Sequence, residues 1–283
     1  MADLNSITQL AFENLSDFHM HPDYSIDATG TVEDYCQASL RRGLAEICFT
    51  THFDANPRSD QAANFIRVNG EKVPTTVENL AQYVDHVHRA AEEFYPYGLS
   101  VKLGVEFGWF DGCEELAAAL KATYPFDYML VGIHEIKDQC FCAMSTYEKC
   151  FANVTVEKAV SEYVRQVVSA AKSGIFNTVA HLDYIKKYGE KFYGQSVNAE
   201  FRKHLPEIFS ALKDSKTAIE VNTASRRIGF ASYYPSIDII NEARRAGVDV
   251  HFLGSDAHKP EHVGFEFEEV IHLVPDAITH CED

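Results

Sequence analysis

The sequence lacks any long apolar segment, and its start lacks the features of an export signal. No run of about 18 apolar residues occurs, which is the length that a membrane-spanning helix needs. Residues 1–14 have neither a basic beginning nor an apolar core, so we expect no signal peptide there. We therefore expect a cytoplasmic protein with no membrane partner.

Cysteine is sparse and poorly spaced for cross-linking. The seven cysteines stand at positions 36, 48, 113, 140, 142, 150 and 281, an odd number with no C-x-x-C pair. This pattern is unsuited to a disulfide framework or to a structural zinc site built from thiolates. We expect reduced thiols, most of them filling the core.

Basic residues are also scarce relative to acidic ones. Lys and Arg number 25 against 42 Asp and Glu, which gives a formal net charge of −17. A nucleic-acid partner is not expected, because contacts to phosphate backbones require clustered Lys and Arg.

Several common catalytic motifs are missing. The spacing Gly189-x4-Gly194 lacks the lysine of a P-loop. There is no G-x-S-x-G motif, and no G-x-G-x-x-G follows the first apolar run, so serine-hydrolase and dinucleotide-binding folds are unsupported.

What the sequence does contain is ordinary globular composition, with 46% hydrophobic residues over 283 positions. This length suits one barrel-sized domain spanning residues 1–283. Seven short apolar runs are predicted as strands: Leu15–His19, Leu44–His52, Leu99–Glu106, Tyr128–His134, Asn177–His181, Ala218–Asn222 and Val248–Ser255. Helical patterns separate them at Val32–Arg42, Glu78–Tyr95, Val156–Ala171, Ala199–Lys213 and Ser236–Ala246.

Alternation of strand and helix predicts an α/β fold with parallel strands, either an open sheet or a closed barrel. Each of the seven runs ends in His, Glu, Asp, Asn or Ser, and the last is followed at once by Asp256. Only closure brings seven strand ends around one point, so the pattern favours the barrel. The polar segment at about 54–76 is predicted as an inserted loop, which either covers a substrate or is simply tolerated.

Histidines and carboxylates accumulate after these runs. The pair His19-Met-His21 is a weak signal alone, although alternate residues of a strand share one face. Together the candidates exceed what one ion can bind, and they fit about three divalent ions of Zn, Mn or Fe. The candidate ligands are His19, His21, Asp27, His52, Glu106, His134, His181, Asp256 and His258.

Seven blocks in order resemble the PHP (polymerase and histidinol phosphatase) family, and within it the stand-alone histidinol-phosphate phosphatases. The blocks are DFHMHPDYSID, FTTHFD, GVEFGW, FDYMLVGIHEIKD, VAHLDYIKKYG, AIEVNTASRR with YPSIDIINEARRAG, and GSDAHKPEHVG. The resemblance implies a distorted (β/α)7 TIM-like barrel, with a trinuclear metal site at the C-terminal ends of the strands.

The resemblance also implies how the ligands are shared. One ion would take His19, His21, Glu106 and Asp256, a second would share Glu106 and add His134 and His181, and a third would take Asp27, His52 and His258. Many relatives have a histidine near position 27, so Asp27 is a departure from the family pattern, with Asp23 as a possible substitute.

The implied activity is metal-dependent hydrolysis of a small phosphate monoester, L-histidinol phosphate, to L-histidinol and phosphate. Glu106, Asp256 and His258 are the expected catalytic residues. Lys186, Arg226 and Arg227 are candidates for contacts to the phosphate or, alternatively, exposed loop cations. Asp54, Glu135 and Asp183 could attract the cationic end of the substrate, or orient the histidine ligands instead.

Three other functions remain open at this point. A PHP-family phosphoesterase could act on a different small substrate, such as a nucleotide. An amidohydrolase-like enzyme would also begin with H-x-H, but it would need a metal-bridging lysine in place of Glu106. A metal-binding barrel without activity is the third alternative. The sequence does not indicate an oligomeric state.

Overall fold

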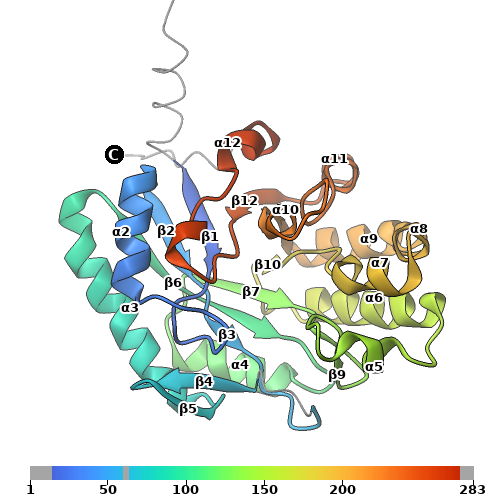
Figure 1. The fold of residues 1–283 in the computed structure, drawn as a ribbon, viewed down its shortest axis with the longest axis horizontal. Coiled ribbons are helices and arrows are strands. Elements are labelled where there is room, and N and C mark those ends of the chain that lie inside the picture. Colours follow the sequence, from blue (N-terminus) through green and yellow to red (C-terminus); the bar gives the residue numbers. More distant parts are fainter. Residues whose placement is uncertain (1–14, 60–63, 275–283) are drawn as a thin grey trace, which may run out of the picture.

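The computed structural model describes residues 15–59 and 64–274, and these form a nearly closed barrel of parallel strands surrounded by helices (Figure 1). Neighbouring strands follow the order β1-β2-β6-β7-β10-β11-β12, with β3 also paired to β6. Their bounds are Ser16–Met20 for β1, Glu46–Phe49 for β2, His52–Phe53 for β3, Ser100–Gly108 for β6, Tyr128–Gly132 for β7, Thr178–Val179 for β10, Ala218–Asn222 for β11 and Val250–Gly254 for β12. The predicted distorted TIM-like barrel is confirmed.

The second predicted strand is divided into β2 and β3. Thr50 interrupts it: its backbone N–H donates to the Met20 carbonyl (2.9 Å) and its hydroxyl accepts from the Met20 N–H (3.1 Å). After this exchange, β3 pairs with β6 alone, and His52 lies opposite Glu106. The break therefore places a histidine beside the carboxylate at the end of the neighbouring strand.

The seam between the last strand and the first has little regular pairing. It is joined where the strands end, by a parallel bridge between Met20 and Ala257 and by donation from the Asp256 N–H to the His19 carbonyl (2.7 Å). Asp17 reinforces the seam, since its carboxylate accepts from the N–H groups of Ser255 and Gly264, both at 3.0 Å. The barrel is thus closed mainly at the end that carries the polar residues.

Helices cover the outside of the barrel (Figure 1). They are α2 (Val32–Arg42), α3 (Ala81–Phe94), α4 (Glu114–Thr123), α5 (Tyr147–Phe151), α6 (Val156–Lys172), α7 (Lys186–Tyr193), α8 (Ser196–Lys203), α9 (Leu205–Ser215), α10 (Ala224–Arg227), α11 (Ile237–Ala246) and α12 (Phe267–Val270), with 3-10 turns at Glu78–Leu80, Tyr95–Tyr97, Pro260–His262 and Ile271–Leu273. Thr31 begins α2 through a capping box with Asp34, as its sequence position indicates. No described helix is long and apolar enough to cross a bilayer.

One predicted helix is in fact two shorter helices. The pattern over Ala199–Lys213 forms two helices, α8 and α9, which meet at His204. Pro206 lies in the first turn of α9, where its missing N–H costs nothing, whereas in a continuous helix its ring would clash with the preceding turn. Both helices pack against α6, so the break wraps the chain around that helix.

The predicted insertion is more ordered than a loop. Within its described parts, residues 54–59 and 64–76, it forms an antiparallel hairpin of β4 (Phe65–Val68) and β5 (Glu71–Pro74). Ile66 forms an isolated bridge with Ser25, and the Arg67 N–H donates to the Tyr24 carbonyl (2.9 Å). The hairpin therefore packs on the loop that follows β1. A second small hairpin, β8 (Glu135–Ile136) with β9 (Gln139–Cys140), follows β7.

Candidate metal centre

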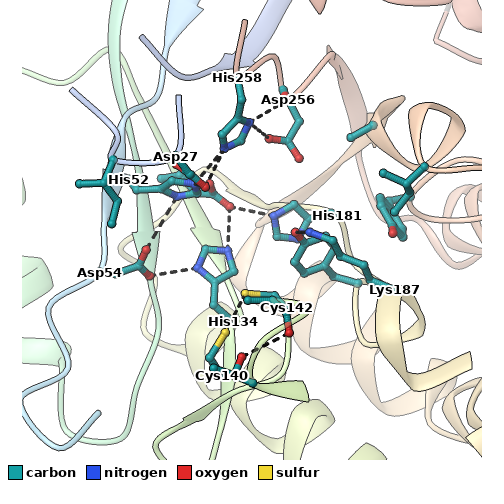
Figure 2. Close-up of a pocket in the computed structure, with 18 of the residues that line it drawn as sticks. Asp27, His52, Asp54, His134, Cys140, Cys142, His181, Lys187, Asp256 and His258 are labelled. Atoms are coloured by element: carbon teal, nitrogen blue, oxygen red, sulfur yellow. Dashed lines mark hydrogen bonds and ion pairs between the residues drawn. The ribbon is translucent and has the colours of Figure 1, made fainter. Parts of the chain in front are cut away.

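The nine candidate ligands meet at one end of the barrel. Seven of them lie near the C-terminal ends of β1, β6, β7, β10 and β12, His52 begins the two-residue strand β3 that follows β2, and Asp27 comes from the loop after β1. Most of them line a cavity of about 570 Å³ (Figure 2). His19 and His21 are not among its lining residues and are fully buried. The strand-end pattern in the sequence thus corresponds to a single site.

Glu106 is the centre of the ligand set and is completely buried. Its Oε1 faces the Nε2 atoms of His134 (3.2 Å) and His181 (2.8 Å). Its Oε2 faces the ring nitrogens of His19 (3.3 Å), His21 (3.5 Å) and His52 (3.0 Å). One carboxylate therefore offers each oxygen to a different group of histidines, the arrangement expected of a residue that bridges two ions.

A separate group forms at the outer side of the site. Asp27 Oδ2 is 3.4 Å from His258 Nε2 and 3.9 Å from His52 Nε2, and the two histidine nitrogens are 3.3 Å apart. Asp256 Oδ1 links this group to the inner one, at 3.3 Å from His21 Nε2 and 3.4 Å from His258 Nδ1. The alternative residue, Asp23, makes no described contact with any of these histidines.

The residues present fit divalent metal ions. Buried atoms left without a hydrogen-bond partner include Nε2 of His19 and His21, Nδ1 of His52 and Oε2 of Glu106. Polar atoms buried without partners are costly, and four around one point indicate an ion that they would bind. The spacings of 2.8–3.9 Å between donor atoms suit ligands that each approach an ion at roughly 2.0–2.2 Å.

Further polar residues orient these histidines through their other ring nitrogen. His19 Nδ1 contacts both carboxylate oxygens of Glu220 at 3.0 Å, and His134 Nδ1 contacts Asp54 Oδ1 at 3.0 Å. Such pairs fix the tautomer of a metal-binding imidazole. Sequence reasoning missed Glu220, although a carboxylate within the apolar strand AIEVN was an available signal, since a buried acid requires a partner.

Burial and neighbouring charges shift the pKa values of the candidate ligands in both directions. Burial lowers the pKa values of His19, His52 and His134, but the surrounding carboxylates raise them further, so a metal ion would have to displace those protons. Burial alone would raise the pKa of Glu106, yet the charges of His19, His52 and His134 hold it well below its ordinary value. Burial, together with His52 and His258, lowers the pKa of His21 well below its ordinary value. Glu106 is therefore a carboxylate and His21 a neutral imidazole, as ligands must be.

The backbone around the site is shaped to admit these side chains. A Cβ at Gly132 would lie 2.5 Å from His134 Nε2 and 2.6 Å from Glu106 Oε1, so only glycine leaves room there. His181 and Asp256 adopt φ angles of 33° and 52°, values that side chains rarely take. Strain of this kind is commonly retained where it positions functional groups.

The predicted phosphate-binding cations do not all reach the cavity. Lys186 is buried elsewhere, where its Nζ donates to Asp183 (2.7 Å) and to the Tyr233 carbonyl (2.8 Å). Arg226 pairs with Glu266 (2.9 Å) outside the cavity. Of the three predictions, only Arg227 lines the cavity, and the sequence analysis did not select Lys187, which also does.

The three acids considered for the cationic end of a substrate are also divided. Asp54 lines the cavity but is bonded to His134. Glu135 accepts from Asn56 Nδ2 (2.6 Å), and Asp183 pairs with Lys186, both away from the cavity. The contact of Asp54 with His134 fits the alternative expectation for these acids, that they orient histidine ligands.

The inserted hairpin holds the Asp27 loop in place. The Arg67 guanidinium donates to four carbonyl groups of that loop, those of Asp23 (2.9 Å), Ser25 (2.7 Å), Ile26 (2.5 Å) and Ala28 (3.1 Å). These carbonyls surround Asp27 on both sides. The hairpin therefore supports the loop that carries Asp27, a contact that neither of the two expectations for the insertion included.

The fold and the site together define a class, the TIM-like barrels with a histidine- and carboxylate-rich metal centre at the strand ends. Within that class, the PHP domain model matches residues 17–224, and the chain belongs to this family. The amidohydrolase-like alternative is not supported, since Glu106 occupies the centre of the site.

Similar proteins extend over nearly the whole chain. A probable histidinol-phosphatase of Deinococcus radiodurans is 29% identical over 265 residues, which cover 93% of both chains. The histidinol-phosphatase of Lactococcus lactis is 26% identical over 86% of this chain and 83% of its own. A crystal structure of the histidinol phosphate phosphatase from the same organism, in complex with zinc, L-histidinol and phosphate, has the same fold. Its TM-score is 0.74 at 23% identity, and the match covers 94% of this chain and 95% of that one.

Proposed function

We propose that this protein hydrolyses L-histidinol phosphate to L-histidinol and phosphate with about three bound divalent ions of Zn, Mn or Fe. The observation that carries the proposal is the convergence of histidines from four strands on both oxygens of Glu106. The names of the relatives and the zinc, L-histidinol and phosphate in the Lactococcus lactis structure support this choice of substrate and metal. The six described cysteines are free, which fits the reducing cytoplasm.

The ligand groups support the following assignment of ions. His19, His21 and Asp256 with Glu106 would hold the first ion. His134 and His181, which both face Glu106 Oε1, would hold the second, and Asp27, His52 and His258 the third. When bound, such ions neutralise phosphate charge and lower the pKa of a water molecule, so that no protein nucleophile is required.

His52 has a position that differs from this simple division. Its Nε2 faces Asp27 and His258, while its Nδ1 lies 3.0 Å from Glu106 Oε2. We assign Nε2 as the atom that would bind the outer ion, while the buried Nδ1, which has no hydrogen-bond partner, faces Glu106. One imidazole would thereby link the outer ion to the central carboxylate.

Asp256 is our candidate for moving a proton to the leaving alcohol. His258 would bind an ion through Nε2, and its Nδ1 lies 3.1 Å from the backbone carbonyl of Asp256, so both ring nitrogens are used. Asp256 borders the cavity with a carboxylate whose second oxygen makes only a 3.5 Å contact, with Asn222. Burial opposes ionisation of Asp256, but His19, His21 and His258 hold its pKa well below the ordinary value, so the carboxylate is ionised. Its second oxygen would accept a proton from a water molecule and pass it to the departing group.

Lys187 and Arg227 are the proposed contacts to the phosphate. Lys187 Nζ donates to the Tyr184 hydroxyl (2.6 Å), and the Tyr184 ring stacks on His181 with centroids 4.0 Å apart. Arg227 donates to the carbonyls of Ser255 (2.6 Å) and Asp256 (2.7 Å), which fixes it beside a ligand. Both cations therefore lie at the border of the metal site, where they can offset the charge of a phosphate ester.

Steady-state kinetics on the zinc- or manganese-loaded protein test the proposed function. We expect kcat/KM for L-histidinol phosphate to exceed the values for AMP, a sugar phosphate and an aryl phosphate by about tenfold or more. Glu106→Gln should lower all four values by about a hundredfold or more, because it removes the bridging charge, whereas the exposed Glu115→Gln should not. A tenfold preference for AMP would contradict the substrate assignment, and full activity of Glu106→Gln would contradict the metal assignment.

A further inference from the structure

Two cysteines meet at the rim of the metal cavity. Cys140 ends β9 and Cys142 follows it after one residue, so in extended backbone both side chains leave on the same side. Their sulfur atoms are 3.2 Å apart, and both residues line the cavity beside His134 (Figure 2). The separation of the sulfurs is about one ångström longer than a disulfide bond.

The residue between the two thiols is firmly held. The Phe141 N–H donates to the carbonyl of His134 (3.2 Å), and its side chain is fully buried. Its ring contacts those of Phe151, Tyr163 and Tyr184 at centroid distances of 5.7–6.2 Å. With Phe141 fixed, the two sulfurs face each other without any rearrangement of the hairpin.

The pair differs from the other described cysteines. Burial raises the pKa values of Cys36, Cys113 and Cys150 to about 12, so these thiols stay protonated at neutral pH. The hydrogen bond from Cys142 lowers the pKa of Cys140 to about 6, which favours its thiolate. Among the described residues, no group suited to a metal ion includes a cysteine, so a metal-binding role is not indicated.

We propose that Cys140 and Cys142 are a reversible thiol–disulfide pair, oxidised by hydrogen peroxide or a related peroxide. The Cys140 sulfur attacks one peroxide oxygen, breaks the O–O bond and becomes a sulfenic acid, with release of one water. The Cys142 sulfur then displaces the hydroxyl from Cys140 as a second water, and the S–S bond forms. Two thiols are oxidised by two electrons, and one peroxide is reduced to two waters.

The two cysteines line the metal cavity, so a disulfide between them would change the wall of that cavity. The bond would close within the hairpin segment that holds the carbonyl of His134, at the border of the cavity. It would thereby connect the metal cavity to the thiol redox state of the surroundings. The proposal does not depend on which phosphate ester the protein hydrolyses.

The sequence allows a direct test by mass spectrometry. Trypsin cleaves after Lys137 and Lys149, and the peptide 138–149 contains Cys140 and Cys142 but no other cysteine. Zinc-loaded protein would be treated with peroxide, its remaining thiols blocked with N-ethylmaleimide, and the digest analysed. Zinc is used because it has no redox chemistry of its own. We expect a peptide two hydrogens lighter and without maleimide, which a phosphine reductant returns to the doubly blocked form.

Variants separate the pair from general cysteine oxidation. Cys142→Ser changes a partly exposed residue and should leave Cys140 as a sulfenic acid that dimedone traps. Cys113→Ser, at a buried cysteine elsewhere, should still form the lighter peptide. The proposal is overturned if wild-type peptide 138–149 carries two maleimides after peroxide, or if Cys140 passes to sulfinic acid without a cross-link. Oxidation of Met144 in the same peptide adds an oxygen and is distinguished by mass.

Discussion

At the residue scale, Glu220 shows how a side chain outside the ligand set can control it. Both of its oxygens contact His19 Nδ1, and Oε1 also accepts from the His181 N–H (2.8 Å). Glu220→Gln keeps the volume but replaces one acceptor with an amide donor. We expect metal affinity to fall by about 10–100-fold with the fold retained.

Competition with a chromophoric chelator would measure that affinity, and circular dichroism would report the fold. Glu207→Gln is a matched control, because Glu207 is exposed on α9 and its described partner, His204, is not a candidate ligand. Unchanged affinity in Glu220→Gln would mean that other contacts orient His19.

Lys187 is the residue on which to test the proposed phosphate contact. Its neighbour Lys186 is also a cation, but it is buried against Asp183. Lys187→Gln should lower kcat/KM by about tenfold or more, mainly through KM, since it removes a charged hydrogen bond to the substrate. Arg226→Gln is the control, because Arg226 pairs with Glu266 away from the cavity. Equal kinetics for the two variants would contradict a phosphate contact for Lys187.

The difference between Lys186 and Lys187 also shows a limit of sequence reasoning at this scale. The position of Lys186 after a strand indicates a phosphate contact from a loop. In the structure Lys186 is instead the first residue of helix α7. Successive residues of a helix point about 100° apart, so the helical phase turns Lys186 towards Asp183 and Lys187 towards the cavity. Without the helix, the sequence could not distinguish the two lysines.

At the scale of elements, the inserted hairpin has a testable role in metal binding. Arg67→Lys keeps the charge but cannot donate to four carbonyls at once. We expect the Asp27 loop to lose its shape and the protein to bind about one ion fewer per chain, with the inner ligands unaffected.

Elemental analysis of purified Arg67→Lys would give the metal content. Arg58→Lys is the matched control, because Arg58 belongs to the same insertion but pairs with Asp138 and not with the Asp27 loop. The same metal content in wild type and Arg67→Lys would show that the loop holds its conformation without the guanidinium.

The elements themselves were predicted well where local signals act alone. Thr31 and Gly43 bound α2 at both ends, and apolar runs placed the strands that carry the ligands. The hairpin was not predicted, because its stability depends on Arg67 and Ile66 contacting a loop some forty residues earlier. Contacts of that kind leave no periodic pattern in the sequence.

At the scale of the whole molecule, metal removal should destabilise the protein. The ligands come from both ends of the chain and do not form a site when it is unfolded. Each bound ion therefore stabilises the folded state by about 2.7 kcal/mol when its free concentration is a hundredfold above its Kd. We expect a strong chelator to lower the melting temperature and added Zn or Mn to restore it. Calorimetry on both forms would measure this, with Glu106→Gln showing a smaller shift; equal melting temperatures for chelated and loaded wild type would contradict the metal centre.

The seam between β12 and β1 has a consequence for the order of events in folding. It joins residues about 240 positions apart, the most distant pairing in the barrel, and such contacts form late because the intervening chain must first be ordered. His19 and His21 lie on one side of this seam, and Asp256 and His258 on the other. We therefore expect ions bound across it to act after the folding barrier, so that they slow the opening of the barrel more than they speed its assembly.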